Sequence, residues 1–157
     1  MDEHGNEMWR IAGRRTSVSI PTEKHQQLPG NILVHNHPQE QNADFTLSDA
    51  DAQFLIQHGL RQIRAVTPKY RFLMELARPL EDTQRADTAE RVAREWLRNA
   101  RTLHREKQSK LRRKVENGRM TPAEMSRQLT AAWAESQHQA WRKIADRFGL
   151  RYKREKR

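Results

Sequence analysis

The chain has 157 residues, 35% of them hydrophobic and 32% charged, which allows one medium domain, or a small domain with an extension, around a modest core. It contains no cysteine, so disulfides and thiolate zinc sites are excluded and any metal ion must be bound by His, Asp or Glu. No apolar run approaches membrane-spanning length, the N-terminus has neither a basic leader nor an apolar signal core, and the formal net charge is +10.

Three extended segments are predicted in the first 37 residues. A run with period-two alternation covers residues 7–12 and begins at Glu7, and a second run covers residues 16–21. The third segment, residues 31–37, opens with a short apolar run after a Pro-Gly turn signal and reads as a buried strand.

The third strand carries two histidines. Side chains alternate along a strand, so His35 and His37 are expected on the same side, and Pro38 favours an extended His37 and stops the strand there. The imidazoles are therefore displayed at the end of the strand.

A helix is predicted after a loop that covers residues 39–46. Ser48 has the character of an N-cap, the helix runs to about Gly59, and Asp51 lies in its first turn, where it can face the strand end. Two further strands are predicted at 62–67 and 70–76, separated by a short turn at Pro68.

Charge divides the chain near residue 80. Residues 1–80 hold nine Lys or Arg and nine Asp or Glu, whereas residues 81–157 hold twenty-one against eleven and so carry the whole excess. Apolar residues at spacings of three and four predict a helix from about Asp87 to Gly118. A capping box at Thr121 with proline after it predicts a second helix that ends near Gly149.

The short connection between these helices predicts an antiparallel hairpin, with its tryptophans in the core. The expected fold class is therefore α+β: a small mixed sheet with a metal-site helix in residues 1–80, followed by a basic helical hairpin extension in residues 81–157.

His35, His37 and Asp51 together suggest a metal centre, because two imidazoles and one carboxylate leave the fourth position of a tetrahedral zinc ion for water. That arrangement is typical of a catalytic zinc site. Other interpretations stay open: Ser48-x-x-Asp51 is also an ordinary capping pattern, and a His-x-His pair is often a surface or core feature.

The sequence His35-x-His37-Pro38 with Ser48-x-x-Asp51 resembles the JAMM motif of MPN+ zinc metallopeptidases, and is most similar to the RadC-like branch. The resemblance covers about residues 5–77. It implies that His35, His37 and Asp51 bind zinc and that Ser48 helps to stabilise the oxyanion of a tetrahedral intermediate.

The resemblance also implies a glutamate on an earlier strand, which shuttles a proton from the zinc-bound water to the leaving amine. Glu7 is the candidate, with Glu3 and Glu23 as competitors. The implied protein is a zinc-dependent peptidase or isopeptidase that acts on a protein or peptide substrate.

Nucleic acid or another polyanion is a second expected partner, because two segments of the chain, 101–114 and 151–157, concentrate positive charge. The alternative to this interpretation is a solvated helix face. The nucleic-acid-binding candidates in the first segment are Arg101, Arg105, Lys107, Lys110, Arg112, Arg113 and Lys114.

Two other functions therefore remain open. One is a nuclease or toxin effector domain, supported by a weaker similarity to phage head-associated and polymorphic-toxin terminal domains with the same His-Asn-His-Pro signature. The other is a non-catalytic nucleic-acid-binding module whose histidines are structural. We expect a cytoplasmic protein, or one delivered into a cytoplasm as part of a larger protein, with no contact to a membrane.

Overall fold

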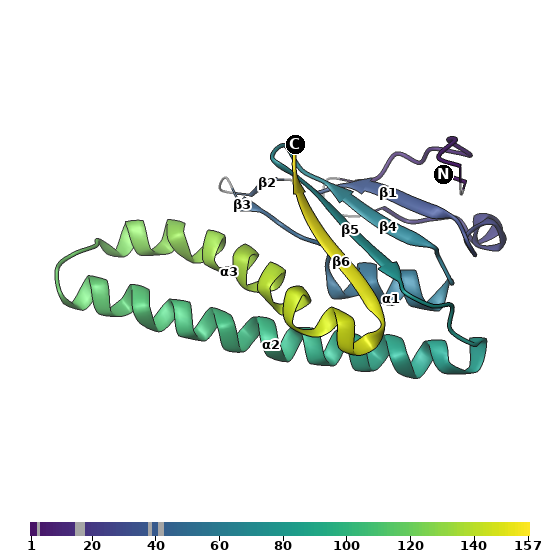
Figure 1. Ribbon diagram of the computed structural model, residues 1–157. Helices are drawn as coiled ribbons and strands as arrows, with labels where there is room; N and C mark the ends of the chain where they lie inside the picture. The colour runs from purple at the N-terminus through teal and green to yellow at the C-terminus, as the bar shows by residue number, and fades with distance from the viewer. Residues whose placement is uncertain (3, 15–17, 38, 41–42) are drawn as a thin grey trace.

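The computed structural model describes residues 1–2, 4–14, 18–37, 39–40 and 43–157, and its α+β fold confirms the predicted fold class (Figure 1). A four-stranded mixed sheet lies against helices, and the chain returns to the sheet after a long helical hairpin. In chain order the elements are η1 (Thr22–Gln27), β1 (Ile32–Asn36), β2 (Gln39–Glu40), β3 (Ala43–Asp44), α1 (Asp49–Gln57), β4 (Gln62–Val66), β5 (Tyr70–Leu76), α2 (Asp82–Glu116), α3 (Pro122–Ile144), η2 (Ala145–Phe148) and β6 (Leu150–Lys156).

The main sheet has the strand order β1-β4-β5-β6. β1 and β4 are parallel, with α1 in the connection between them, whereas β4, β5 and β6 are antiparallel neighbours. A tight turn joins β4 to β5, in which the N–H of Thr67 donates to the carbonyl of Tyr70 at 2.9 Å. The predicted strands at 31–37, 62–67 and 70–76 are thus confirmed, and the carboxyl ends of the two parallel strands lie together.

The two long helices form the predicted antiparallel hairpin. α2 has 35 residues, which corresponds to a length of about 50 Å at 1.5 Å per residue, and α3 has 23. The capping box that opens α3 is present, with the Thr121 hydroxyl accepting from the Glu124 N–H. The closed end of the hairpin projects beyond the sheet (Figure 1).

One hydrophobic core joins the sheet to the helices, and residues on both sides of position 80 contribute to it. Trp96 of α2 stacks on Trp141 of α3 with ring centroids 5.3 Å apart, and Phe72 of β5 belongs to the same cluster. These two tryptophans are buried, as predicted, whereas Trp133, the third in the hairpin, is only partly buried. The segments before and after residue 80 therefore differ in charge but share one hydrophobic core.

Two predictions about local structure are wrong. Residues 7–12 form no strand: Trp9 packs against the core, but no described strand pairs with this segment. Of the run at 16–21, Thr16 and Ser17 lie outside the described residues, and 18–21 are not strand. The basic segment at 151–157, for which no secondary structure was predicted, contributes to strand β6, which pairs with β5.

No helix in the described part of the chain combines the length and the apolar character that are needed to cross a bilayer.

Candidate metal centre

Two histidines lie at the carboxyl end of β1. His35 is within the strand, opposite Ala65 of β4, and His37 follows the last strand residue. The N–H of His37 donates to the carbonyl of Val66 at 2.9 Å, so the backbone stays extended through the second histidine. Alternation along this backbone puts both rings on one side, as predicted, with their Nε2 atoms 2.8 Å apart.

Asp51 reaches the histidines from the first turn of α1. Its Oδ2 accepts hydrogen bonds from the backbone N–H of Ser48 at 2.6 Å and from the Ser48 hydroxyl at 2.8 Å. The Ser48 hydroxyl in turn accepts from the Asp51 N–H at 3.2 Å, which completes a capping box. The capping interpretation of this pair is therefore confirmed, and the cap holds the Asp51 carboxylate where it reaches the two histidines.

The donor atoms of His35, His37 and Asp51 converge on one point and could hold a metal ion. His35 Nε2 lies 3.1 Å from Asp51 Oδ1, and His37 Nε2 lies 3.6 Å from Asp51 Oδ2. Ligands bound about 2.0–2.1 Å from a tetrahedral ion are separated by about 3.3 Å, which falls among these spacings. The side chains are only 14–16% exposed, so the group is sheltered and still reachable.

Contacts within this group shift the pKa values of Asp51 and His37. Burial would raise the pKa of Asp51, but hydrogen bonds from His35 and His37 outweigh it and hold that pKa well below its usual range. Burial would lower the pKa of His37, but its interaction with Asp51 raises it. Asp51 is therefore an anion at neutral pH, and a proton competes with any cation for His37.

The two histidines differ in how their second ring nitrogen is supported. His37 Nδ1 lies 3.1 Å from the carbonyl of Phe45, which can only accept, so in the neutral ring Nδ1 carries the proton and Nε2 presents its lone pair. His35 Nδ1 is buried and has no hydrogen-bond partner among the described residues. With Nε2 as its protonated nitrogen, His35 can donate toward His37 or Asp51, and an ion bound there would displace that proton.

The four residues before α1 connect the site to the rest of the fold. The Phe45 carbonyl orients His37, and the Thr46 hydroxyl lies 2.6 Å from the Tyr152 hydroxyl. The Leu47 carbonyl accepts from the Trp141 indole N–H at 2.7 Å, and Ser48 caps the helix. Each of these residues is held by a different element, so the position of the site depends on α3 and β6 as well as on β1.

Sequence reasoning missed this support because Thr46 and Tyr152 are 106 positions apart. Tyr152 also bonds to His138 Nδ1 at 2.7 Å, and burial lowers the pKa of His138 to about 4. A single tyrosine in a run of cations was the one available signal, and spacing alone could not connect it to Thr46.

The glutamates proposed for proton transfer are placed differently from the ligands. Glu7 is exposed and forms an ion pair with Arg10 at 2.7 Å, and it does not belong to the group that could hold a metal ion. Glu23 is exposed on η1, and Glu3 lies outside the described residues. Ser48 is at the site, but its hydroxyl proton is directed at Asp51.

The cations of α2 divide into a paired and an unpaired set. Toward the start of the helix, four arginines pair with acids three or four residues before them, at distances of 2.5–3.5 Å: Arg85, Arg91, Arg94 and Arg98. Toward its end, six exposed cations form no ion pair within the described part of the chain: Arg101, Arg105, Lys110, Arg112, Arg113 and Lys114. The seventh candidate, Lys107, differs because its Nζ is buried and burial lowers its pKa.

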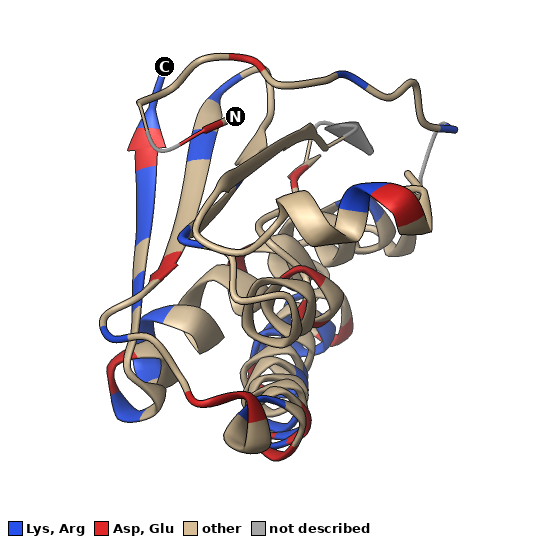
Figure 2. Ribbon diagram, turned by 90° about the vertical axis from the view of Figure 1, so that its right-hand side faces the viewer, with Lys and Arg blue, Asp and Glu red and all other residues tan. Residues whose placement is uncertain are grey.

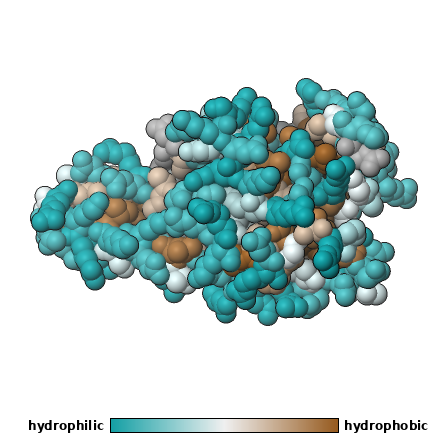
Figure 3. Space-filling model, in the orientation of Figure 1, coloured by the Kyte–Doolittle hydropathy of each residue, from teal (hydrophilic) through white to brown (hydrophobic). Residues whose placement is uncertain are grey.

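The unpaired set lies on the projecting end of the hairpin, where the surface is mostly hydrophilic (Figure 3). The other basic segment, β6, shows Lys and Arg along its length (Figure 2). Part of its charge is neutralised, because Arg151 pairs with Glu75 at 3.4 Å and Arg154 with Glu135 at 2.8 Å.

The chain was compared with protein-family models, with curated proteins and with solved structures, and none of these comparisons found a match.

Proposed function

We propose that this chain is a metal-dependent hydrolase that cleaves an amide bond, with zinc held by His35, His37 and Asp51. One observation carries the proposal: a sheltered group brings one ligand atom from each of the three residues within 4.8 Å of the others, so that they could hold a single ion. Two imidazole nitrogens and one carboxylate oxygen fit a borderline cation such as zinc, and three protein ligands leave a position for water. The resemblance to JAMM peptidases names the same residues.

Zinc bound here would lower the pKa of a water molecule and polarise the carbonyl of the scissile amide. The residues of the chain supply orientation. The Phe45 carbonyl fixes the His37 ring, and Ser48 fixes the Asp51 carboxylate through two hydrogen bonds. We therefore propose Ser48 first as a positioning residue. Its expected role at an oxyanion requires its hydroxyl to turn away from Asp51.

Proton transfer to the leaving amine needs an acid-base residue, and we propose Glu7 for it. In this role Glu7 must exchange its ion pair with Arg10 for the reacting water. Replacing Glu7 with Gln would then lower kcat while the zinc content stays the same.

The experiment incubates zinc-supplied protein with a peptide library and with isopeptide-linked lysine peptides, and identifies products by mass spectrometry. We expect cleavage that a chelator stops and that His37→Gln abolishes, whereas His58→Gln, a histidine at the end of α1, keeps it. Cleavage of DNA or RNA in place of peptides would favour the nuclease alternative. Failure to bind any divalent metal would contradict the metal-dependent hydrolase and leave the nuclease, with His35 and His37 as acid and base, or the non-catalytic binding module.

We also propose that the projecting end of the hairpin binds a polyanion such as nucleic acid. The observation behind it is the contrast along α2, where nearby acids neutralise the first four arginines, whereas six of the seven cations from Arg101 onward are exposed and unpaired in the described chain. Arg101, Arg105 and Arg112 fall on one face of the helix, because spacings of four and seven residues return to nearly the same angle. Such a row can follow a line of phosphates.

Binding to labelled duplex DNA and RNA at several salt concentrations tests this second function. Affinity should fall steeply as salt rises, because the contacts release counterions from the phosphates. Affinity that does not change with salt, or no binding at low salt, would contradict it.

A further inference from the structure

A shallow hollow opens beside the metal centre, at the carboxyl ends of the parallel strands β1 and β4. It has a volume of about 720 Å³ and is lined by Asn36, His37, Val66, Thr67, Pro68 and Arg157. Ligands of open sheets commonly bind at the carboxyl ends of parallel strands, and this volume is in the range of small-molecule sites. Because His37 is part of the lining, a group held in this hollow lies next to the proposed zinc ligands.

Arg157 brings a positive charge to the hollow. Its backbone N–H donates to the carbonyl of Lys69 at 3.0 Å, which fixes the residue to the turn between β4 and β5. Its guanidinium donates to the Thr67 carbonyl at 3.3 Å. Figure 1 shows the end of β6 beside this turn.

Most donor groups of the Arg157 guanidinium remain available. No carboxylate among the described residues lies within ion-pair distance of it, whereas Lys69, from the same turn, is paired with Asp44 at 3.7 Å. A guanidinium has five N–H donors in a fork that matches a carboxylate, so one bond to a carbonyl leaves room for a bidentate partner.

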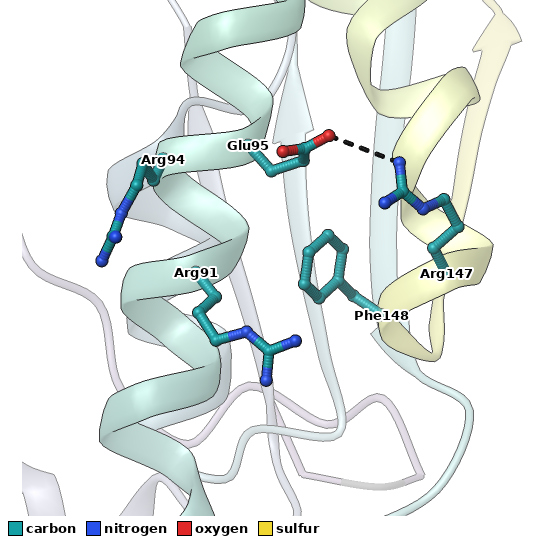
Figure 4. A pocket seen from close by; sticks show the side chains of 5 residues that line it. All are labelled: Arg91, Arg94, Glu95, Arg147 and Phe148. Atoms are coloured by element: carbon teal, nitrogen blue, oxygen red, sulfur yellow. Dashed lines mark hydrogen bonds and ion pairs between the residues drawn. The ribbon is translucent and has the colours of Figure 1, made fainter.

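A second hollow shows what a structural arginine cluster looks like in this protein. It has a volume of about 200 Å³, lies between α2 and η2, and is lined by three arginines, of which Arg94 directs its guanidinium away from it (Figure 4). All three are paired: Arg91 with Asp87 at 3.5 Å, Arg94 with Glu90 at 2.6 Å, and Arg147 with Glu95 at 3.3 Å. Arg91 and Arg94 pair within α2 and Arg147 joins η2 to α2, whereas Arg157 has no carboxylate partner in the described chain and lines the same hollow as His37.

We propose that the hollow beside His37 binds a carboxylate of the substrate, and that Arg157 is the specificity residue that receives it. This inference rests on the proposed amide hydrolase and names its substrate class: a peptide with an acidic side chain, or a terminal carboxylate, next to the cleaved bond. The distance from Arg157 to the metal centre then sets which bond is presented to the reacting water.

The first test uses metal-free protein, so that it does not depend on zinc. N-acetylglycine offers a terminal carboxylate and N-acetylglutamic acid amide a side-chain carboxylate. NMR titration with each should give saturable shifts of the Thr67 amide and the Arg157 Nε–H. Arg157→Gln should weaken the binding about tenfold or more, while the neighbouring control Lys156→Gln changes it by less than about twofold.

Saturable binding of either probe supports the proposal and identifies the source of the carboxylate. Shifts that do not saturate, binding of inorganic phosphate but of neither probe, or equal affinity in Arg157→Gln would overturn it. These outcomes are independent of metal content, so the hydrolase proposal can fail while the carboxylate site stands, or the reverse.

The second test links the hollow to the metal. Succinic acid monohydroxamate and acetohydroxamate share a metal-binding group, but only the first carries a carboxylate. Calorimetry with zinc-loaded protein should find the first about tenfold tighter, and this preference should disappear in Arg157→Gln and persist in Lys156→Gln. Equal affinity of the two compounds for the unaltered protein would overturn the placement of the carboxylate next to the metal.

Discussion

The two regions proposed to be functional, the carboxyl end of β1 and the projecting end of the hairpin, differ in how their polar side chains are held. At β1, three polar side chains are sheltered and bonded to one another, and the segment that holds them is fixed by two other elements. At the hairpin, six cations point into solvent without acidic partners in the described chain. The first region presents a defined geometry that could hold a metal ion, whereas the second presents only a sign of charge.

The largest effect is expected from the ligands. His35→Gln, His37→Gln and Asp51→Asn should each weaken zinc binding by about 100-fold or more, because each removes one of three protein ligands. Competition against a chromophoric chelator measures the affinity. Asp49→Asn, in the same helical turn, and His58→Gln are the matched controls and should bind zinc normally. An unchanged zinc affinity in any of the three ligand variants would show that the altered residue is not a metal ligand, and the contrast between the two regions would fail.

The buried support of the site should make stability depend on pH. The pKa of His138 is lowered to about 4 from an ordinary value near 6.5, so its neutral ring contributes stability above about pH 6.5 that is lost as pH falls toward 4. His37 has the opposite sign, because its pKa is raised and its contribution is lost as pH rises.

Between pH 7 and pH 5 we expect His138 to account for a loss of about 2 kcal/mol in the free energy of unfolding. Urea titrations of metal-free protein should show this slope reduced in His138→Gln and kept in His4→Gln, an exposed histidine. Parallel profiles of His138→Gln and the unaltered protein would contradict the buried assignment.

The nucleic-acid affinity of the hairpin should depend on the number of its unpaired cations. Replacing Arg105, Arg112 and Arg113 with Gln should weaken nucleic-acid binding about tenfold and lower the salt slope by about 3, one for each lost phosphate contact. The control replaces three paired arginines of the same helix, Arg91, Arg94 and Arg98, and should have a smaller effect. Equal effects of the two triple variants would show that pairing is irrelevant and that only net charge matters.

Two capping boxes offer the finest comparison. Ser48→Ala and Thr121→Ala each remove an N-cap hydroxyl, so each should cost about 1 kcal/mol in the free energy of unfolding. Only Ser48→Ala also removes one of the two hydrogen bonds that Ser48 donates to the Asp51 carboxylate, and it should weaken zinc binding by about tenfold. If Thr121→Ala weakened zinc binding equally, the effect would come from global stability and not from orientation of the carboxylate.

Much of this fold could be predicted from local sequence, because the signals are local. Alternation placed His35 and His37 on one side, the capping pattern placed Asp51 at the start of α1, and periodicity with Thr121 placed the hairpin. These features depend on neighbours within four residues.

The features that sequence reasoning missed depend on distant partners. The segment at 7–12 alternates like a strand, yet no described strand pairs with it, and the basic tail forms β6 because β5 offers a free edge. The contacts of Thr46 with Tyr152 and of Leu47 with Trp141 join residues about a hundred positions apart. Such pairings follow from the tertiary fold and leave no spacing pattern in the chain.

The most direct test of the metal centre is anomalous scattering at the zinc edge from crystals of protein purified with zinc. We predict one peak bonded to His35 Nε2, His37 Nε2 and an Asp51 carboxylate oxygen at about 2.0–2.2 Å, with a solvent molecule in the fourth position. A peak elsewhere in the molecule, or no peak at these three side chains, would contradict the account.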